Sequence, residues 1–276
     1  MNMRTILVPV DFTSTTENAV KLSAEWATQY QYTHIILLKA SQEFEFDYLP
    51  NEENVNSHIK RTELLFSRLT GIIAEKSPDV TVLKASTQWT LTRSINDLIK
   101  DQPSVELIIL GSDDQASSAN SFVSENIISI ARTSPVKALI VPNGYTYTTV
   151  KNILIPCDVN TITKLDRLFH HKSIIEQMDV RLMFLNIHKR NGSDDNEDKN
   201  KELEAYIRQY LTTIPSTIHN YYDENIIRGI LTFASSNKTD LIIALPGKHS
   251  FLYYLAGKSI SEGIYQNVNQ PVLILK

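Results

Sequence analysis

Cysteine is nearly absent from this sequence, because Cys157 is the only one in 276 residues. Intrachain disulfides, cysteine-cluster zinc sites and CxxC redox pairs each need at least two cysteines and are therefore excluded. Glycine is scarce as well, with 8 residues, which is roughly 3% against a typical 7%. Any phosphate site lined by glycine must therefore be small or eroded.

Long hydrophobic runs and an excess of basic residues are also missing. No apolar run approaches the roughly 18 residues that span a bilayer, and the net charge of -4 lacks the basic excess of a nucleic-acid binder. Residues 1–12 contain no long apolar signal region and no small-residue cleavage site. We therefore expect a cytoplasmic globular protein that associates with neither membranes nor nucleic acids.

The sequence does contain a repeat at about half its length. Residues 6–11 (ILVPVD) recur as residues 153–158 (ILIPCD), and the later apolar runs follow in the same order. The matched runs are 35–38 with 182–185, 80–85 with 216–221, 106–110 with 240–244, and 135–141 with 271–275. Each half therefore offers five strand candidates, and repeats of this kind decide the architecture.

The runs are short and nearly continuous, which is typical of strands covered on both faces. Between them the apolar spacing becomes helical, and Ser14 to Glu17 is interpreted as a capping box that opens the first helix. The sequence predicts an α/β protein with two doubly wound, five-stranded parallel-sheet domains of the flavodoxin or Rossmann type, each a three-layer α/β/α unit. The predicted domains are residues 1–143 and 150–276, joined by a short polar connection.

These motifs resemble the universal stress protein family, whose fold is similar to that of adenine nucleotide alpha hydrolases. The resemblance rests on ILVPVD and ILIPCD at the start of each copy, on ELIILGS and DLIIALP in the fourth strand, and on the closing PVLILK. It covers nearly the whole chain twice. It implies a tandem form in which the two copies pair through their last strands, as an intramolecular pseudo-dimer with a pseudo-twofold axis. Further homodimerisation is left open.

Members of that family that bind ATP carry an Asp after the first strand. They also carry a loop with G, two residues, G, nine residues, G, then Ser or Thr after the fourth strand. In the first copy these positions hold Gly111, Asp114, Ser124 and Glu125, and Asp113 adds another acid. Carboxylates around a triphosphate repel it. The first copy is therefore expected not to bind ATP.

The second copy allows two registers of the same loop. One register gives Leu245, Lys248, Lys258 and Ser259, and a shift by one residue gives Ala244, Gly247, Gly257 and Lys258. Both registers produce a cationic loop, and residues 150–276 have a net charge of +1 against -5 for residues 1–149. An adenine nucleotide or another small anion is therefore expected in the second copy if anywhere.

The candidate nucleotide-binding residues are Asp158, Gly247, Lys248, Gly257, Lys258 and Ser259. Two alternatives remain open at this stage: Asp11 and Asp158 are equally interpreted as helix caps, and the lysines as ordinary solvated charges.

No catalytic constellation is recognisable in the sequence, and Cys157 is interpreted as a small buried hydrophobe rather than a reactive thiol. We therefore expect a stress-responsive regulatory or binding protein with degenerate nucleotide loops, an unidentified protein partner, no metal and no obligatory cofactor. The alternative is a weak ATP- or AMP-binding protein, including a weak ATPase, that uses the second domain only.

Overall fold

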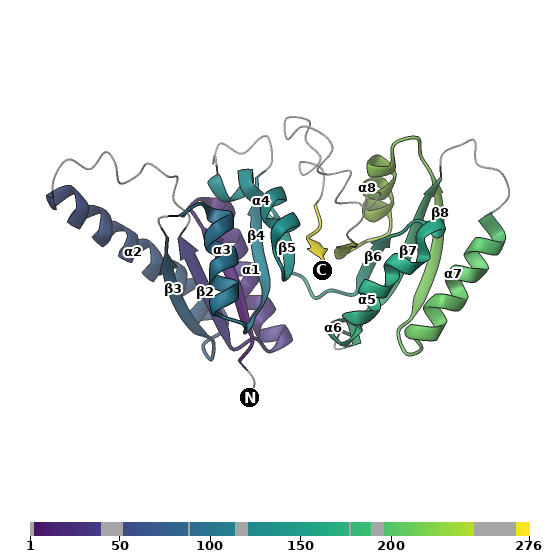
Figure 1. Cartoon of the computed structure of the whole chain (residues 1–276), viewed down its shortest axis with the longest axis horizontal. Helices are drawn as coiled ribbons and strands as arrows, with labels where there is room; N and C mark the ends of the chain where they lie inside the picture. Colours follow the sequence, from purple (N-terminus) through teal and green to yellow (C-terminus); the bar gives the residue numbers. More distant parts are fainter. Residues whose placement is uncertain are drawn as a thin grey trace. The chain divides into compact units, whose positions relative to one another are not determined.

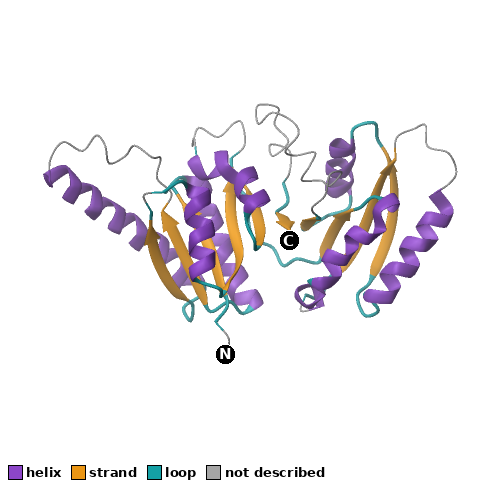
Figure 2. Cartoon of the chain, in the orientation of Figure 1, coloured by secondary structure: helices purple, strands orange, loops and turns teal. Residues whose placement is uncertain are grey.

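The computed structural model describes residues 3–39, 52–87, 89–113, 121–176, 178–188, 196–245 and 269–276. The chain divides into two compact units, Met1–Tyr147 and Thr148–Lys276. The division falls inside the polar connection of residues 143–149. Each unit alternates strands and helices along the chain, as the colours of Figure 2 show.

The first unit contains five strands and four helices in its described part. They are β1 (Thr5–Val10), α1 (Ser14–Tyr30), β2 (His34–Lys39), α2 (Glu52–Lys76), β3 (Thr81–Ser86), α3 (Leu91–Asp101), β4 (Val105–Ser112), α4 (Phe122–Thr133) and β5 (Lys137–Pro142). The strand order is β3-β2-β1-β4-β5, and every neighbouring pair is parallel. The strands that follow β1 are added first on one side of it (β2, β3) and then on the other (β4, β5). The strand order therefore reverses between β1 and β4, and doubly wound sheets bind ligands at the carboxyl ends of the strands at such a point.

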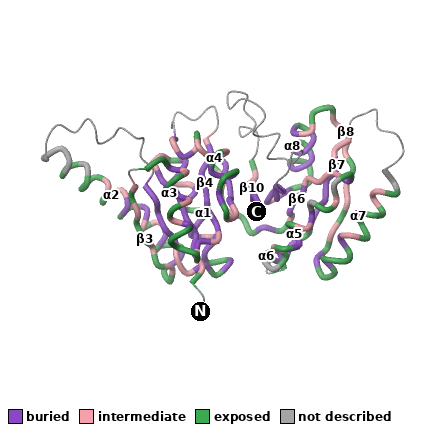
Figure 3. Tube along the Cα trace, in the orientation of Figure 1, coloured by how far each residue is buried: buried purple, intermediate pink, exposed green. Residues whose placement is uncertain are grey.

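Burial explains why these segments form strands. All six residues of β1 are buried, as are nearly all of β2 and β4, whereas the edge strand β3 is largely exposed. Figure 3 shows the same contrast along the chain trace. In Figure 1, α1 and α2 cover one face of this sheet and α3 and α4 cover the other. The near-continuous apolar runs are thus satisfied by a helical layer on each side.

Helix α1 begins one residue differently from the sequence prediction. Its apolar stripe is buried as expected, including Ala19, Leu22, Trp26 and Tyr30. The N-cap, however, is Thr13 rather than Ser14, because the Thr13 side chain accepts a hydrogen bond from the backbone of Thr16. The predicted capping box at residues 14–17 was therefore wrong in register, and the first helical turn starts nearer to Asp11.

The second unit has the same strand pattern. Its elements are β6 (Asn152–Pro156), the 3-10 helix η1 (Val159–Leu165), α5 (Asp166–His170), α6 (Lys172–Glu176), β7 (Arg181–His188), α7 (Asn196–Tyr210), β8 (Ser216–Tyr222), α8 (Ile226–Ser236), β9 (Leu241–Ala244) and β10 (Val272–Ile274). The order is β10-β9-β6-β7-β8, again parallel throughout. The predicted α/β class with two five-stranded parallel sheets is confirmed, while the pseudo-twofold pairing of the last strands stays a prediction.

Among the residues that the structure describes, the two units differ clearly after their first strand. The first unit has a single helix of 17 residues there, whereas the second has η1 followed by two helices of five residues each. The sequence explains the difference, because α1 contains Ala19, Ala24 and Ala27, whereas η1 (VNTITKL) has four β-branched residues in seven. Alanine favours the α-helix and β-branched residues disfavour it. The second unit therefore has short helical segments after β6, in place of the single long helix that follows β1.

Candidate functional site

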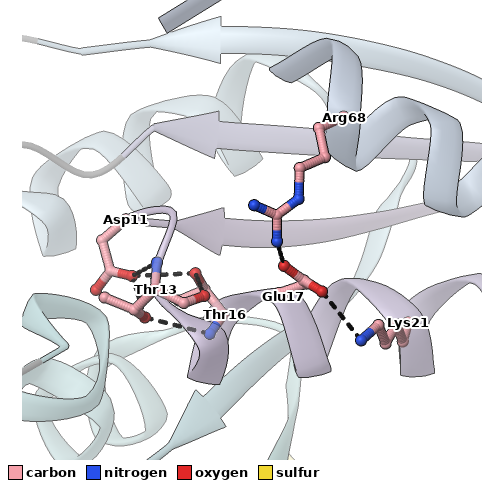
Figure 4. Close-up of polar contacts among 6 residues, drawn as sticks. All are labelled: Asp11, Thr13, Thr16, Glu17, Lys21 and Arg68. Carbon is pink, nitrogen blue, oxygen red and sulfur yellow. Dashed lines mark hydrogen bonds and ion pairs between the residues drawn. The ribbon is translucent and has the colours of Figure 1, made fainter. Parts of the chain in front are cut away.

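The carboxylate of Asp11 lies where β1 ends and accepts hydrogen bonds from two helix N-termini. Its Oδ1 accepts from the backbone of Thr13 at 3.2 Å and from the hydroxyls of Thr13 and Thr16 at 2.7 and 3.0 Å. Figure 4 shows this part of the cluster. Its Oδ2 accepts from the hydroxyl of Ser121 at 2.6 Å and from the backbone of Val123 at 3.1 Å. A single carboxylate thus binds the first turns of both α1 and α4.

Asp113, which follows β4, repeats this arrangement beside Asp11. Its Oδ1 accepts from the hydroxyl of Thr15 in α1, and its Oδ2 accepts from the backbone of Ser121 at 2.9 Å. The backbone of Asp113 donates to the hydroxyl of Ser124 at 2.8 Å. Ser121 is therefore shared, since its hydroxyl binds Asp11 while its amide binds Asp113. The two carboxylates thus accept hydrogen bonds from three backbone amides and four hydroxyls at the starts of α1 and α4.

Gly111 is retained for a packing reason that is visible in the structure. A Cβ atom added at this residue would lie 2.3 Å from the backbone oxygen of Thr15, a distance that real Cβ atoms do not adopt. The end of β4 therefore approaches the first turn of α1 so closely that only glycine fits. The one glycine of the family loop that survives in the first copy is accounted for without a ligand.

A charge network extends this cluster to α2. Glu17, in the first turn of α1, forms ion pairs with Lys21 at 3.0 Å and with Arg68 of α2, as Figure 4 shows. A negative side chain near a helix N-terminus is favourable because the helix dipole is positive there. Three acidic side chains, Asp11, Asp113 and Glu17, thus surround the start of α1.

A phosphate group would meet an unfavourable environment in this first site. Phosphates bind helix N-termini because free backbone amides and the positive dipole end attract negative charge. Here three backbone amides and four hydroxyls bind Asp11 and Asp113, so a phosphate at these donors would have to displace carboxylates and approach their charges. Of the other acids predicted to repel ATP, Glu125 is exposed on α4, and Asp114 lies outside the described residues. In this site the protein's own carboxylates cap the helix N-termini where a phosphate would otherwise bind.

In the second unit, Asp158 has the more local role that its alternative interpretation predicted. It is the N-cap of η1, and its Oδ1 accepts from the backbone and the side-chain amide of Asn160, both at 2.9 Å. The side chain of Asn160 in turn accepts from Lys199 of α7 at 2.7 Å. A cation thus lies close to Asp158, in contrast to the acidic first site.

The strand registers place Leu245 where the first unit has Gly111. Ile6 pairs with Leu107 and Ile153 pairs with Leu241, so the two fourth strands are aligned by equivalent partners. Leu245 is buried. The bulky residue is consistent with the replacement of α1 by η1, since the helical turn that excludes a side chain at Gly111 has changed. Gly247, Lys248, Gly257, Lys258 and Ser259 lie outside the described residues, and their roles stay predictions.

Cys157 precedes Asp158 and is half-buried rather than fully buried as predicted. Burial of its thiol, followed by the charge of Asp158, raises the pKa of Cys157 to about 12. Since the thiolate is the reactive form, a raised pKa disfavours nucleophilic and redox chemistry. In the part of the chain that the structure describes, no three His, Cys, Asp or Glu residues form a metal-binding group.

Sequence reasoning found Asp11, Asp113, Ser124 and Asp158 but missed their partners. Thr13, Thr15, Thr16 and Ser121 supply most of the hydroxyl donors of the first site. A signal was present, because a run of hydroxyl residues after a strand-terminal Asp is typical of helix capping. Ser121 lies far along the chain from Asp11, so no local pattern could link the two.

Comparison with known proteins supports the fold rather than the chemistry. Neither a protein-family model nor a curated protein sequence matches the chain. A universal stress protein from Archaeoglobus fulgidus matches with a TM-score of 0.70 and 14% identity, covering 100% of this chain and 99% of that chain. A functionally unknown protein from Pseudomonas aeruginosa matches with a TM-score of 0.54 and 16% identity, covering 99% and 92%.

A third structure shows that the architecture is shared with a different kind of protein. The cytoplasmic domain of a prokaryotic cation chloride cotransporter matches with a TM-score of 0.53 and 11% identity, covering 99% of this chain and 95% of that chain. Within the described ranges, no helix combines the length and hydrophobicity needed to cross a membrane. The chain therefore has the fold of universal stress proteins, which is a fold that hosts more than one function.

Proposed function

We propose that this chain is a tandem universal stress protein that acts by binding and regulation rather than by catalysis, and that its first unit does not bind nucleotide. The observation that carries this proposal is the double capping of α1 and α4 by Asp11 and Asp113. Five hydrogen bonds end on the Asp11 carboxylate alone.

The energetic argument is one of competition. A phosphate entering the first site must replace hydrogen bonds to a carboxylate, which are among the stronger ones in proteins. It must also lie near the charges of Asp11 and Asp113, whose repulsion grows as water is excluded. Both terms oppose binding. A ligand that entered this site would have to break the hydrogen bonds that cap the first turn of α1.

The second candidate function is weak ATP or AMP binding, including hydrolysis, in the second unit alone. It is favoured by the local hydrogen bonding of Asp158, which binds Asn160, and by the cation Lys199, which binds the side chain of Asn160. The sequence adds Lys248, Lys258 and Ser259, with Gly247 and Gly257 for close backbone approach. Hydrolysis would need a metal ion and a positioned water in addition.

Thermal unfolding with and without nucleotide separates the two functions. We expect millimolar ATP with Mg²⁺, and AMP, to leave the melting temperature unchanged. A ligand present at one hundred times its Kd would add about 2.7 kcal/mol of stability, so binding would be readily visible. A rise that disappears in Lys258→Glu or Asp158→Ala would support the second candidate.

A control variant keeps the outcome interpretable. Lys100→Glu makes the same charge change on an exposed residue of α3, so it reports any general electrostatic effect on nucleotide affinity. A rise that persists in Lys258→Glu and Asp158→Ala but is lost when Asp11 or Asp113 is replaced would place the nucleotide in the first unit and overturn the proposal.

A further inference from the structure

Strand β8 is the last strand of its sheet, and in the described part of the chain it pairs with β7 alone. The backbone of Asp223 donates to the carbonyl of His188 in β7, and the carbonyl of Pro215 accepts from Leu182. In a parallel strand the residues bond alternately to one edge and to the other, so the odd-numbered residues of β8 bond to β7. The N–H and C=O groups of the even-numbered residues therefore point to the outer edge, and these residues are Ser216, Ile218, Asn220 and Tyr222.

The outer edge of β8 lacks the features that usually prevent an edge strand from pairing. Proteins protect such edges with charged side chains, proline or a bulge. The sequence of β8 (STIHNYY) contains no Lys, Arg, Asp, Glu or Pro, and its register against β7 is continuous over all 7 residues. Burial lowers the pKa of the His219 imidazole below its usual value, so this side chain is neutral at pH 7. β8 is therefore an uncharged, regular edge that another strand can extend.

The edge strand of the first unit, β3, is different in this respect. The backbone of Thr81 donates to the carbonyl of Thr33, so the odd-numbered residues of β3 face β2 and Lys84 directs its own N–H outward. The Lys84 side chain is exposed near the middle of the strand. Two copies of β3 placed side by side would bring two ammonium groups close together, which is destabilising. Charge therefore protects the edge of β3 and leaves the edge of β8 open.

The side chains of β8 are complementary to a second copy of the same strand. In an antiparallel pair with a twofold axis at Asn220, this residue lies opposite itself, and Ile218 lies opposite Tyr222 of the second copy. Pairs of an aromatic and a β-branched residue across two strands are favourable, and two amide side chains can donate to each other. Tyr222 is 64% exposed and Ile218 is partly exposed. The pairing would cover both side chains.

The backbone groups of β8 suit the same arrangement. Residues that lie opposite each other in an antiparallel pair and point their backbone groups inward exchange both of their hydrogen bonds. Helix α8 would not interfere, because it packs on the other face of the strand, where His219 and Tyr221 contact Phe233. Asn220 and Tyr222, which are two residues apart and share a face, are both exposed. The pair can therefore form without rearrangement of the second unit.

We propose that β8 is a self-association surface, through which two copies of this chain join their second units as an antiparallel strand pair with a twofold axis at Asn220. A second copy fits better than a charged peptide or a nucleic acid, because the strand offers no charge to either. One strand pair buries less than the roughly 1,200–2,000 Å² of a stable interface, so the dimer is expected to be of moderate affinity. This inference goes beyond the proposed function, since it uses no residue of either nucleotide loop.

Sedimentation equilibrium of the full chain, from micromolar to submillimolar concentration, tests the proposal. We expect the wild type to show a monomer–dimer equilibrium. Asn220→Pro removes an N–H that β7 does not use, and it should weaken the dimer at least tenfold while the circular dichroism spectrum stays unchanged. Lys84→Pro is the matched control, because it removes an outward N–H from β3 and should leave the dimer intact. A monomeric wild type, or equal dimerisation of the wild type and Asn220→Pro, would overturn the proposal.

Two charge variants keep the proposal falsifiable if Asn220→Pro fails to fold. Because Asn220 lies opposite itself, Asn220→Lys or Asn220→Asp alone places like charges together, and each variant should be monomeric at low salt. An equimolar mixture places opposite charges together and should restore a heterodimer, which native mass spectrometry detects. A substitution that merely damaged the fold would not be rescued by mixing. Wild-type dimerisation of either variant alone, or the absence of a heterodimer in the mixture, would contradict the twofold axis at Asn220.

Discussion

The hydroxyl of Ser121 donates a hydrogen bond of 2.6 Å to the carboxylate of Asp11, although the two residues are 110 positions apart in the chain. This contact joins the end of the first strand to the start of α4. The contact therefore stabilises the packing of α4 against the carboxyl end of β1. It contributes to the stability of the first unit, and the predictions below test this contribution and those of nearby residues.

Asp11→Ala should destabilise the protein by about 2–4 kcal/mol, because it leaves three hydroxyls and two backbone amides without their acceptor. Urea unfolding at neutral pH measures the change. Glu125→Ala, which removes an exposed acid of α4, should stay within about 0.5 kcal/mol of the wild type. Similar values for the two variants would show that the capping network contributes little.

Asp158→Ala should cost less than Asp11→Ala, at about 0.5–1 kcal/mol, because the hydrogen bonds described for Asp158 are those of an N-cap on η1. The same urea experiment compares these equivalent positions of the two copies directly. A loss of stability as large as that of Asp11→Ala would mean that Asp158, like Asp11, links more than one helix to the end of its strand.

Gly111→Ala should be strongly destabilising, by at least about 2 kcal/mol, because its new Cβ would meet the backbone of Thr15. Gly71→Ala is the matched control, since Gly71 lies within α2 and a Cβ there meets nothing within 4 Å. The control should gain about 0.5–1 kcal/mol from helix propensity. Opposite signs for the two variants are the expected result, and a neutral Gly111→Ala would contradict the close approach.

Cys157 should resist labelling by a thiol reagent at pH 8 in the folded protein, because the raised pKa keeps its thiol protonated. Labelling should speed up through the urea unfolding transition, as the side chain becomes exposed. The rate of reagent release, followed by absorbance, measures this. Rapid stoichiometric labelling under native conditions would show that the thiol is accessible.

The protein should lose stability as the pH rises above about 9. Burial raises the pKa of Cys157 from 9.0 to about 12 and that of Tyr32 from 10.0 to about 12. In this window the unfolded chain releases protons that the folded chain retains, so unfolding becomes more favourable as pH increases. Urea midpoints at pH 8, 9 and 10 test the trend, and Cys157→Ala should weaken it. Equal midpoints at pH 8 and 10 would refute the assignment.

The inner strands were predictable because they consist almost entirely of buried aliphatic residues, whereas the edge strands β3 and β8 are largely exposed and gave a weaker signal. Each apolar run of the sequence corresponds to a strand, from residues 6–10 to residues 272–274. The repeat supplied their order, since a doubly wound sheet follows from alternating strands and helices. Even so, the N-cap of the first helix is Thr13 rather than Ser14, because hydroxyl residues at 13–16 offer several chemically similar caps.

The candidate site was less predictable, since its key contacts are long-range. The sequence identified Asp11 and Asp113 as acids in a family loop, but only the fold brings Thr15 and Ser121 to them. Local sequence patterns thus predict the helices and strands, whereas the hydrogen bonds of the site depend on how those helices and strands pack together.

The carboxylate of Asp11 takes the place that a dissolved anion would otherwise fill at the starts of α1 and α4. Because this anion is part of the polypeptide, its local concentration does not vary with the composition of the surrounding solution. The starts of the two helices should therefore be equally ordered in buffers rich or poor in phosphate.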